Sequence, residues 1–206
     1  MTFKALALLL LAAFYCCYYV KLFLQRRKGI RTNQVGVGKT RFIKWIECTM
    51  MLSSVLVLIV ELGSIFLDTS QLPDWARWIG AGIALCGVIL FVVSVLTMRD
   101  SWRAGVSPTD KTELVTSGVY AISRNPAFLG FDLVYIGILL MFFNWILLAA
   151  TSFAALMFHL QIVNVEEDFL LEAFGEDYIA YRKSVNRYLG RRPSRNQRHC
   201  AAQENK

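Results

Sequence analysis

The sequence predicts an all-α integral membrane protein with about five transmembrane helices, of which the last two form a helical hairpin. Of its 206 residues, 56% are hydrophobic, and the mean hydropathy is +0.46. Such values are typical of a polytopic membrane protein rather than a soluble domain. The apolar residues fall into runs of about 20, the length that crosses a bilayer. Lys and Arg gather on one side of these runs, as in cytoplasmic loops.

The first three apolar runs make up residues 1–98. They cover Ala5–Leu24, Phe42–Leu67 and Trp75–Met98, and a basic loop at residues 25–44 joins the first two. The first run also resembles the core of a signal peptide. No clear small-residue cleavage site follows it, so we expect a retained helix.

Two kinds of residue inside these runs predict local structure. Gly80, Gly82 and Gly87 indicate close packing of the third helix against a neighbour. Glu47 and Glu61 lie near the two ends of the second run. We therefore expect both carboxylates at the membrane interface rather than in a proton relay.

Charge and cysteine content exclude several classes of protein. The net charge is +7, but the basic residues cluster at the ends of apolar runs, which indicates a bilayer surface and not nucleic acid. The five cysteines are scattered and form no C-x-x-C pair. The sequence therefore predicts neither a metal site nor a disulfide framework.

Residues 99–190 form the second unit. A polar segment, Arg99–Asn125, is followed by apolar runs at Pro126–Phe143 and Trp145–Val165, with only Asn144 between them. A connection this short predicts an antiparallel helical hairpin.

An odd number of spans places the basic loop, the polar segment and the basic polar tail, 191–206, on one side. The positive-inside rule makes that side the cytoplasm and puts the N-terminus outside. A bacterial inner membrane and the endoplasmic reticulum both remain open, as does the oligomeric state.

Two polar stretches flank the hairpin and so return to the same membrane face. Arg124-Asn125-Pro126 precedes its first helix, where proline suits a helix start. Glu166 and Glu167 follow its second helix and point about 100° apart on a helix. We expect one of them to face a ligand and the other to pair with Arg124 or to face water. The alternative is solvated charge that only ends an apolar helix.

Further candidates lie beside these stretches. Asp132, one or two turns inside the fourth run, is a functional candidate because acids inside membrane helices are rare. Its closeness to the helix N-terminus offers a structural explanation instead. Five residues after the acid pair have helical spacing and are expected to pack one face against the bundle. They are Phe169, Leu170, Phe174, Tyr178 and Tyr181.

Several motifs together resemble the core of the isoprenylcysteine carboxyl methyltransferases, whose wider group includes the phospholipid methyltransferases. They are Leu114–Tyr120 (LVTSGVY), Arg124–Phe128 (RNPAF), the acid pair, and Phe174–Tyr181 (FGEDYIAY). The resemblance covers roughly residues 101–190, and the spacing of these motifs around the hairpin is specific.

The resemblance implies an S-adenosylmethionine site at the cytoplasmic ends of the last helices and a lipophilic acceptor that enters from the membrane. The methyl group would pass in line from sulfonium to acceptor, with catalysis by positioning and water exclusion. We assign Arg124 and Glu167 to catalysis. The implied cofactor-binding residues are Thr112, Glu113, Leu114, Val115, Tyr120, Asn125, Pro126, Ala127, Phe128 and Glu166.

This chain departs from the family pattern at three positions. Asn125 replaces a histidine, Gly190 replaces a proline, and Ile162 replaces an arginine thought to meet the substrate carboxylate. An uncharged site cannot bind a carboxylate bidentately. We place Ile162, Gln161 and Asp132 at the acceptor.

The leading hypothesis is a membrane-embedded S-adenosylmethionine-dependent methyltransferase that acts on a membrane lipid or a prenylated acceptor. It is most similar to a protein-S-isoprenylcysteine carboxyl O-methyltransferase. Phospholipid N-methylation is the alternative within the class. An NADPH-dependent enzyme similar to sterol reductases and a non-catalytic membrane protein are the alternatives outside it.

Overall fold

The computed structural model describes residues 2–28, 40–102 and 113–191, and most of these residues are helical. The elements are α1 (Thr2–Arg27), α2 (Arg41–Leu67), α3 (Asp74–Met98), η1 (Arg99–Ser101), η2 (Gly118–Ala121), α4 (Pro126–Met141), α5 (Trp145–Gln161), η3 (Ile162–Glu166) and α6 (Glu167–Ser184).

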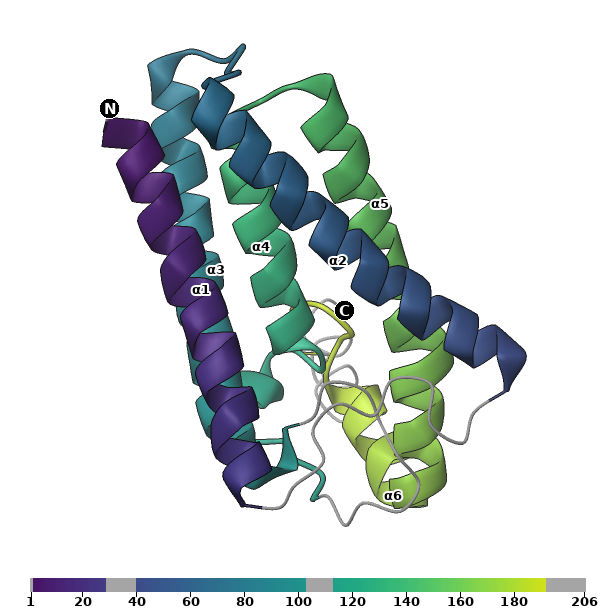
Figure 1. Ribbon diagram of the computed structural model, residues 1–206. Coiled ribbons are helices and arrows are strands. Elements are labelled where there is room, and N and C mark those ends of the chain that lie inside the picture. The colour runs from purple at the N-terminus through teal and green to yellow at the C-terminus, as the bar shows by residue number, and fades with distance from the viewer. Residues whose placement is uncertain (1, 29–39, 103–112, 192–206) are drawn as a thin grey trace, which may run out of the picture.

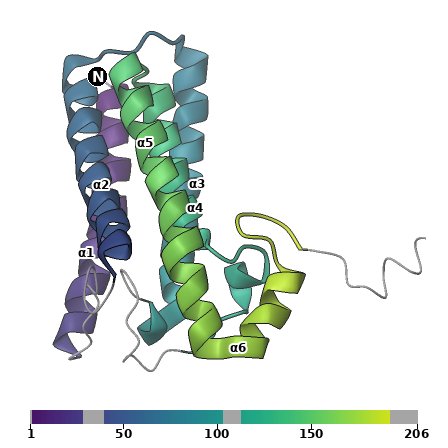
Figure 2. The same cartoon turned by 90° about the vertical axis from the view of Figure 1, so that its right-hand side faces the viewer.

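Helices α1 to α5 form a bundle that α2 crosses obliquely, and α6 folds back at one end of it (Figures 1 and 2). The C-terminal ends of α1, α3 and α5 share that end. In the described part of the chain, four helical stretches are long and apolar enough to cross a membrane. They are Thr2–Arg27, Arg41–Leu67, Asp74–Ser101 and Trp145–Ser184, with α4 as a shorter apolar helix. The predicted multi-pass membrane fold is confirmed.

Helix α4 is shorter than a bilayer span. Its 16 residues extend about 24 Å, against a hydrocarbon core of roughly 30 Å. The far end of α4 is fixed, because Asn144 just beyond it donates to Ser64 Oγ and Thr69 Oγ1 at 2.8 and 2.9 Å.

Glycines bring α3 and α4 into backbone contact. A Cβ built on Gly80 would lie 2.5 Å from the carbonyl oxygen of Gly137, and one built on Gly87 would lie 2.8 Å from that of Gly130. The close packing predicted for Gly80 and Gly87 is confirmed. The prediction for Gly82 is wrong, because no atom of the described residues lies within 4 Å of a Cβ built there.

The turn between α4 and α5 is as short as predicted, and the hairpin is confirmed. Asn144 caps α5 by accepting from Leu147 N–H at 2.9 Å. Each helix nevertheless packs mainly on a different partner, α4 on α3 and α5 on α2. A space can therefore open between the two arms of the hairpin.

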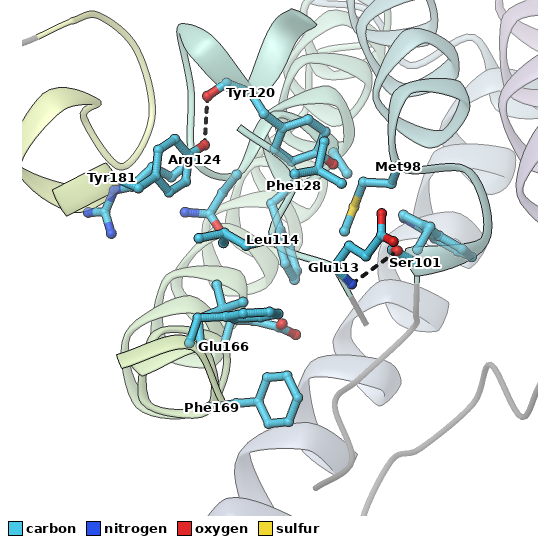
Figure 3. A pocket seen from close by; sticks show the side chains of 16 residues that line it. Met98, Ser101, Glu113, Leu114, Tyr120, Arg124, Phe128, Glu166, Phe169 and Tyr181 are labelled. Atoms are coloured by element: carbon cyan, nitrogen blue, oxygen red, sulfur yellow. Dashed lines mark hydrogen bonds between the residues drawn. The ribbon is translucent and has the colours of Figure 1, made fainter. Parts of the chain in front are cut away.

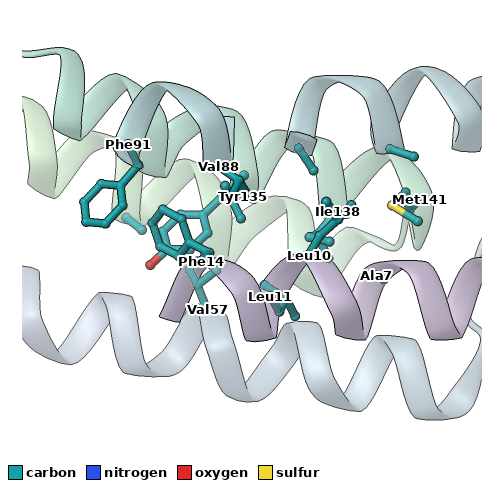
Figure 4. Close-up of a cluster of buried hydrophobic side chains, with 14 of the residues drawn as sticks. Ala7, Leu10, Leu11, Phe14, Val57, Val88, Phe91, Tyr135, Ile138 and Met141 are labelled. Carbon is teal, nitrogen blue, oxygen red and sulfur yellow. The ribbon is translucent and has the colours of Figure 1, made fainter. Parts of the chain in front are cut away.

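A cluster of buried apolar side chains from α1 to α5 fills the bundle (Figure 4). Phe14 of α1 lies 4.7 Å, ring centre to ring centre, from both Phe91 of α3 and Phe131 of α4. Tyr135 stacks on Phe158 of α5 at 6.0 Å. These contacts hold the helices around the end of the bundle that carries the polar motifs.

Glu47 and Glu61 are both 0% exposed, so neither side chain extends along the surface of the protein. Their position at a membrane interface stays a prediction. The apolar sequence around Glu61 gives no sign of this burial, because only the packing of α2 on its neighbours decides which face of the helix is covered.

Helix α6 is kinked at Gly175, whose φ of +48° is favourable only for glycine. The kink turns the second half of the helix so that Tyr178 and Tyr181 pack with Val185 against Leu114 and Leu170. The aromatic face predicted to pack on the bundle instead packs largely on the segment before α4.

Candidate functional site

A buried ionic cluster joins the segment before α4 to the C-terminal segment. Arg124 Nη1 lies 3.1 Å from Glu167 Oε1 and donates to the Tyr178 hydroxyl at 2.8 Å. Arg187 donates to the same carboxylate from Nε at 2.7 Å and from Nη2 at 3.0 Å. We call Arg124, Glu167, Tyr178 and Arg187 the Glu167 cluster. The expected pairing of Arg124 with one of the two glutamates is observed, and Glu167 is the partner.

Charge and burial act in opposite directions on Glu167. Burial alone would raise the pKa of its carboxyl group, but the hydrogen bonds from Arg187 and the positive charge of Arg124 lower it below the ordinary value of 4.5. The hydrogen bond to Glu167 in turn raises the pKa of Arg187. Glu167 is therefore a carboxylate with two cationic partners, which is an arrangement for holding segments together.

Main-chain contacts complete this connection. The Tyr181 hydroxyl donates to the Tyr120 carbonyl at 2.6 Å, and Asn125 Nδ2 donates to the Arg187 carbonyl at 3.2 Å. Gly190 N–H donates to the Ile122 carbonyl at 2.8 Å, and its φ is +103°. A proline, which the resemblance implies at this position, could provide neither that donor nor that φ, so Gly190 has a structural reason.

The ends of α3 and α4, the segment after residue 112 and η3–α6 together surround a first cavity, which we call the polar cavity (Figure 3). Glu113 and Glu166 contribute carboxyl groups, and several aromatic rings complete the wall. The cavity is lined by Met98, Ser101, Trp102, Glu113, Leu114, Val115, Tyr120, Arg124, Asn125, Ala127, Phe128, Glu166, Phe169, Leu170, Phe174 and Tyr181.

Most of the residues predicted to bind the cofactor line this cavity. The exceptions are Thr112, which lies outside the described residues, and Pro126, which is buried at the start of α4 without lining the cavity. Of the two residues assigned to catalysis, Arg124 lines the cavity and Glu167 does not. Their roles stay predictions.

The two adjacent glutamates face different ways, as successive residues of a helix do, and they lie at the end of a π turn. In η3 the Glu167 N–H donates to the Ile162 carbonyl, five residues earlier. Glu166 then faces the polar cavity and Glu167 its cluster. Gln161 Nε2 donates to Glu166 Oε1 at 3.3 Å.

A second cavity, which we call the apolar cavity, opens among α1, α2, α4 and α5 and has a volume of about 360 Å³. Its walls are mainly aromatic and aliphatic, with Tyr15, Met50 and Phe131 among them. The two cavities share Trp102, Ala127, Phe128 and Glu166 as lining residues. They therefore meet at the start of α4 and the end of η3.

The three residues predicted to contact the acceptor have different surroundings. Gln161 lines the apolar cavity, whereas Ile162 is 0% exposed and lines neither cavity. Asp132 also lines neither. Burial and the nearby charge of Asp132 both raise the pKa of the Tyr188 hydroxyl. That hydroxyl also contacts His159 Nδ1 at 2.6 Å.

Several residues that line the cavities or belong to the Glu167 cluster were not predicted as site residues. Trp102, shared by both cavities, lies in the polar segment without a motif around it. Phe169 and Phe174 were predicted only as packing residues. Arg187, the closest partner of Glu167, lies 20 residues beyond it. The sequence shows an acid at Glu167 and a basic residue downstream of it at Arg187. Their spacing alone does not predict that the two side chains pair.

The fold and the cavities define a multi-pass membrane protein with a polar and an apolar cavity that meet at one end of its helical bundle. The model of the phospholipid methyltransferase family matches residues 75–177, half of the chain. The chain therefore belongs to the phospholipid methyltransferase family.

Curated relatives agree with this assignment. Protein-S-isoprenylcysteine O-methyltransferase of Xenopus laevis is 32% identical over 126 residues, covering 58% of this chain and 44% of the relative. The enzyme of the same name from Tribolium castaneum is 30% identical over 127 residues, covering 58% and 45%. That from Saccharomyces cerevisiae is 39% identical over 109 residues, covering 52% and 46%. The chain thus spans less than half the length of these three relatives.

Proposed function

We propose that this protein transfers a methyl group from S-adenosylmethionine to a lipophilic acceptor, and that it is most similar to a protein-S-isoprenylcysteine carboxyl O-methyltransferase. The observation that carries the proposal is the meeting of the two cavities at Glu166 and Phe128. One cavity has the carboxyl groups and aromatic rings of a cofactor site. The other has the apolar walls that a lipid chain needs and lies between helices that cross the membrane.

The polar cavity fits the chemistry of the cofactor. S-adenosylmethionine supplies a methyl group activated by a sulfonium charge, together with an ammonium group and an aromatic base. The Glu166 carboxylate is a matching partner for a cationic group, and the rings of Tyr120, Phe128 and Phe169 offer faces for a base or a cation. Arg124 Nε has no hydrogen-bond partner among the described residues, which makes Arg124 the candidate for binding a carboxylate.

The polar cavity is small for a site that binds a cofactor. Between its described walls the polar cavity measures about 120 Å³, below the roughly 300–1,000 Å³ of pockets for drug-sized ligands. We expect the walls around Leu114 and Phe169 to move apart when the cofactor binds.

The reaction requires little chemistry from the protein. For a carboxylate acceptor, a carbon–oxygen bond forms as the carbon–sulfur bond breaks, the thioether leaves uncharged, and no proton moves. Trp102, Phe128 and the surrounding apolar walls exclude water, and the meeting of the cavities sets the line of approach. Because α4 is shorter than a full membrane span, we infer that this point lies within reach of a lipid chain. By the positive-inside rule, we infer that this end of the bundle faces the cytoplasm.

Binding and transfer test the proposal separately. Purified protein in detergent should bind S-adenosylhomocysteine in calorimetry, and Glu166→Ala should weaken that binding. It should also transfer a labelled methyl group to an S-prenylated cysteine. Absence of S-adenosylhomocysteine binding by the wild-type protein would falsify the proposal, and stabilisation by NADPH instead would favour a reductase.

Phospholipid N-methylation is the second candidate. The family description and the acidic wall of the site support it, since Glu113 and Glu166 would attract an amine. Transfer to an amine phospholipid but not to an S-prenylated cysteine would identify it.

A further inference from the structure

Gln161, the last residue of α5, is a buried amide at the point where the two cavities meet. It is 0% exposed and lines the apolar cavity. Its Nε2 donates to Glu166 Oε1 at 3.3 Å. Its Oε1 has no hydrogen-bond partner among the described residues.

The contact with Glu166 fixes which way the amide faces. A carboxylate only accepts hydrogen bonds, so the NH₂ group of Gln161 must be the atom that faces Glu166. Oε1 is then turned away as a buried acceptor that needs a donor. An unsatisfied buried acceptor is costly, which indicates that a partner arrives with a ligand.

The π turn of η3 makes this arrangement possible. Gln161 and Glu166 are five residues apart, and on a regular α-helix they would point about 140° apart. A π turn has i→i+5 hydrogen bonds and so brings residues five apart close to the same face. π turns inside α-helices are frequent at functional sites.

We propose that Gln161 is a specificity residue whose Oε1 accepts a hydrogen bond from an N–H group of the methyl acceptor. The inference rests on the proposed function. Among the described residues that line the apolar cavity, Glu166 carries the only carboxyl group and no Lys or Arg is present. A methyl acceptor that reaches Glu166 from this cavity therefore meets oxygen atoms that accept hydrogen bonds. These oxygens favour a hydrogen-bond donor at the polar end of the methyl acceptor.

Both candidate acceptors carry such a donor. A prenylated cysteine has an amide N–H two bonds from its carboxyl carbon, and an amine lipid has N–H groups on the methylated nitrogen itself. A lipid with a carboxyl group but no N–H would leave Gln161 Oε1 without a partner.

The experiment compares two acceptors on the same protein. One is S-prenylated N-acetylcysteine. The other is S-prenylated 3-mercaptopropionic acid, which keeps the carboxyl group and lacks the N–H. We expect the wild-type protein to prefer the first by about tenfold or more in kcat/KM, the size of one buried hydrogen bond. In Gln161→Met the preference should fall to less than threefold.

Two variants serve as controls. Asn164→Ala removes another amide of the same turn, which donates to the Leu160 carbonyl and lines neither cavity, so the preference should persist. Gln161→Glu places a second carboxyl group beside Glu166, where the two are expected to share one proton. It keeps an acceptor oxygen, so the preference should also persist. A displaced Glu166 would change both acceptors alike and leave their ratio unchanged, so the ratio reports on Oε1 itself.

Three outcomes overturn the inference: no preference in the wild-type protein, an unchanged preference in Gln161→Met, or its loss in Asn164→Ala. If the wild-type protein binds S-adenosylhomocysteine but shows any of these, the inference fails and the proposed function stands. If it binds no S-adenosylhomocysteine, the proposed function itself has failed. If only an amine phospholipid is methylated, a tenfold or larger loss of kcat/KM in Gln161→Met supports the inference with the donor on nitrogen, and a smaller loss overturns it.

Discussion

Glu167 at the end of the bundle and Glu61 within it are both buried, yet their surroundings differ. Glu167 has two arginines as partners, at 2.7 and 3.1 Å. Glu61 is 0% exposed, and neither of its carboxyl oxygens has a hydrogen-bond partner among the described residues. Burial therefore does not by itself distinguish an acid that holds the structure together from one that costs stability.

The difference follows from the elements that carry each residue. Glu167 begins α6, where Arg124 and Arg187 reach its carboxylate. Glu61 lies in α2, which packs mainly on α5, and its side chain is near the phenols of Tyr15 and Tyr135. The first site has partners that match its charge, and the second has only weak dipoles nearby.

Removing the Glu167 carboxylate should have the largest effect. Glu167→Ala leaves Arg124 buried without its counter-ion, and breaking a buried ion pair costs about 3–5 kcal/mol. We expect the midpoint of thermal unfolding in detergent to fall sharply and S-adenosylhomocysteine binding to be lost with it.

A double variant sharpens this test. Arg124→Met combined with Glu167→Leu removes both buried charges, and Arg187, which is 32% exposed at its side chain, can turn to water. Recovery of more than half the lost stability would show that the unpaired Arg124 causes the loss. No recovery would show that the cluster acts through specific geometry instead.

Glu166 should respond in the opposite manner to its neighbour. Glu166→Gln keeps the shape of the side chain and removes the charge that faces the polar cavity. Hydrogen bonds to charged groups contribute about 1.5–3 kcal/mol, so S-adenosylhomocysteine affinity should fall about 10- to 100-fold while the unfolding midpoint changes little. Equal losses of binding and stability would remove the distinction between the two glutamates.

The pH dependence of stability should also distinguish the ionised from the protonated form of Glu167. The folded pKa of this group lies below its ordinary value of 4.5, so its contribution to stability is fully present above that value. It is lost as pH falls through the folded pKa. The difference in unfolding midpoint between the wild-type protein and Glu167→Gln should therefore be constant near neutral pH and shrink below about pH 4.5. A difference that grows on acidification would contradict this assignment.

The sequence predicted the helices well because long apolar runs leave little choice in a membrane. The predicted start at Trp75 and the observed start at Asp74 differ by one residue. The sequence did not predict which faces of the helices pack together. Gly80 and Gly87 lie seven residues apart and share a face of α3, whereas Gly82 points elsewhere, and only the position of α4 decides this.

The candidate site was predicted in part for the same reason. The motifs before α4 and after α5 are local, and the hairpin returns them to one end of the bundle. The π turn was not predictable, because Ile162–Glu166 has the composition of an ordinary helix end. Without that turn, the contact between Gln161 and Glu166 does not follow.

Glu61 should show the smallest effect, and of opposite sign. Replacing a buried polar group that has no partner with an apolar side chain of similar size removes a desolvation cost. Glu61→Leu should therefore stabilise the protein by about 1 kcal/mol, and a gain of that size raises the unfolding midpoint of a chain of this length by roughly 2–4 °C. Leu62→Met, on the same helix, controls for the substitution itself. A loss of stability in Glu61→Leu would mean that Glu61 has a bound partner in the membrane, and the contrast with Glu167 would then disappear.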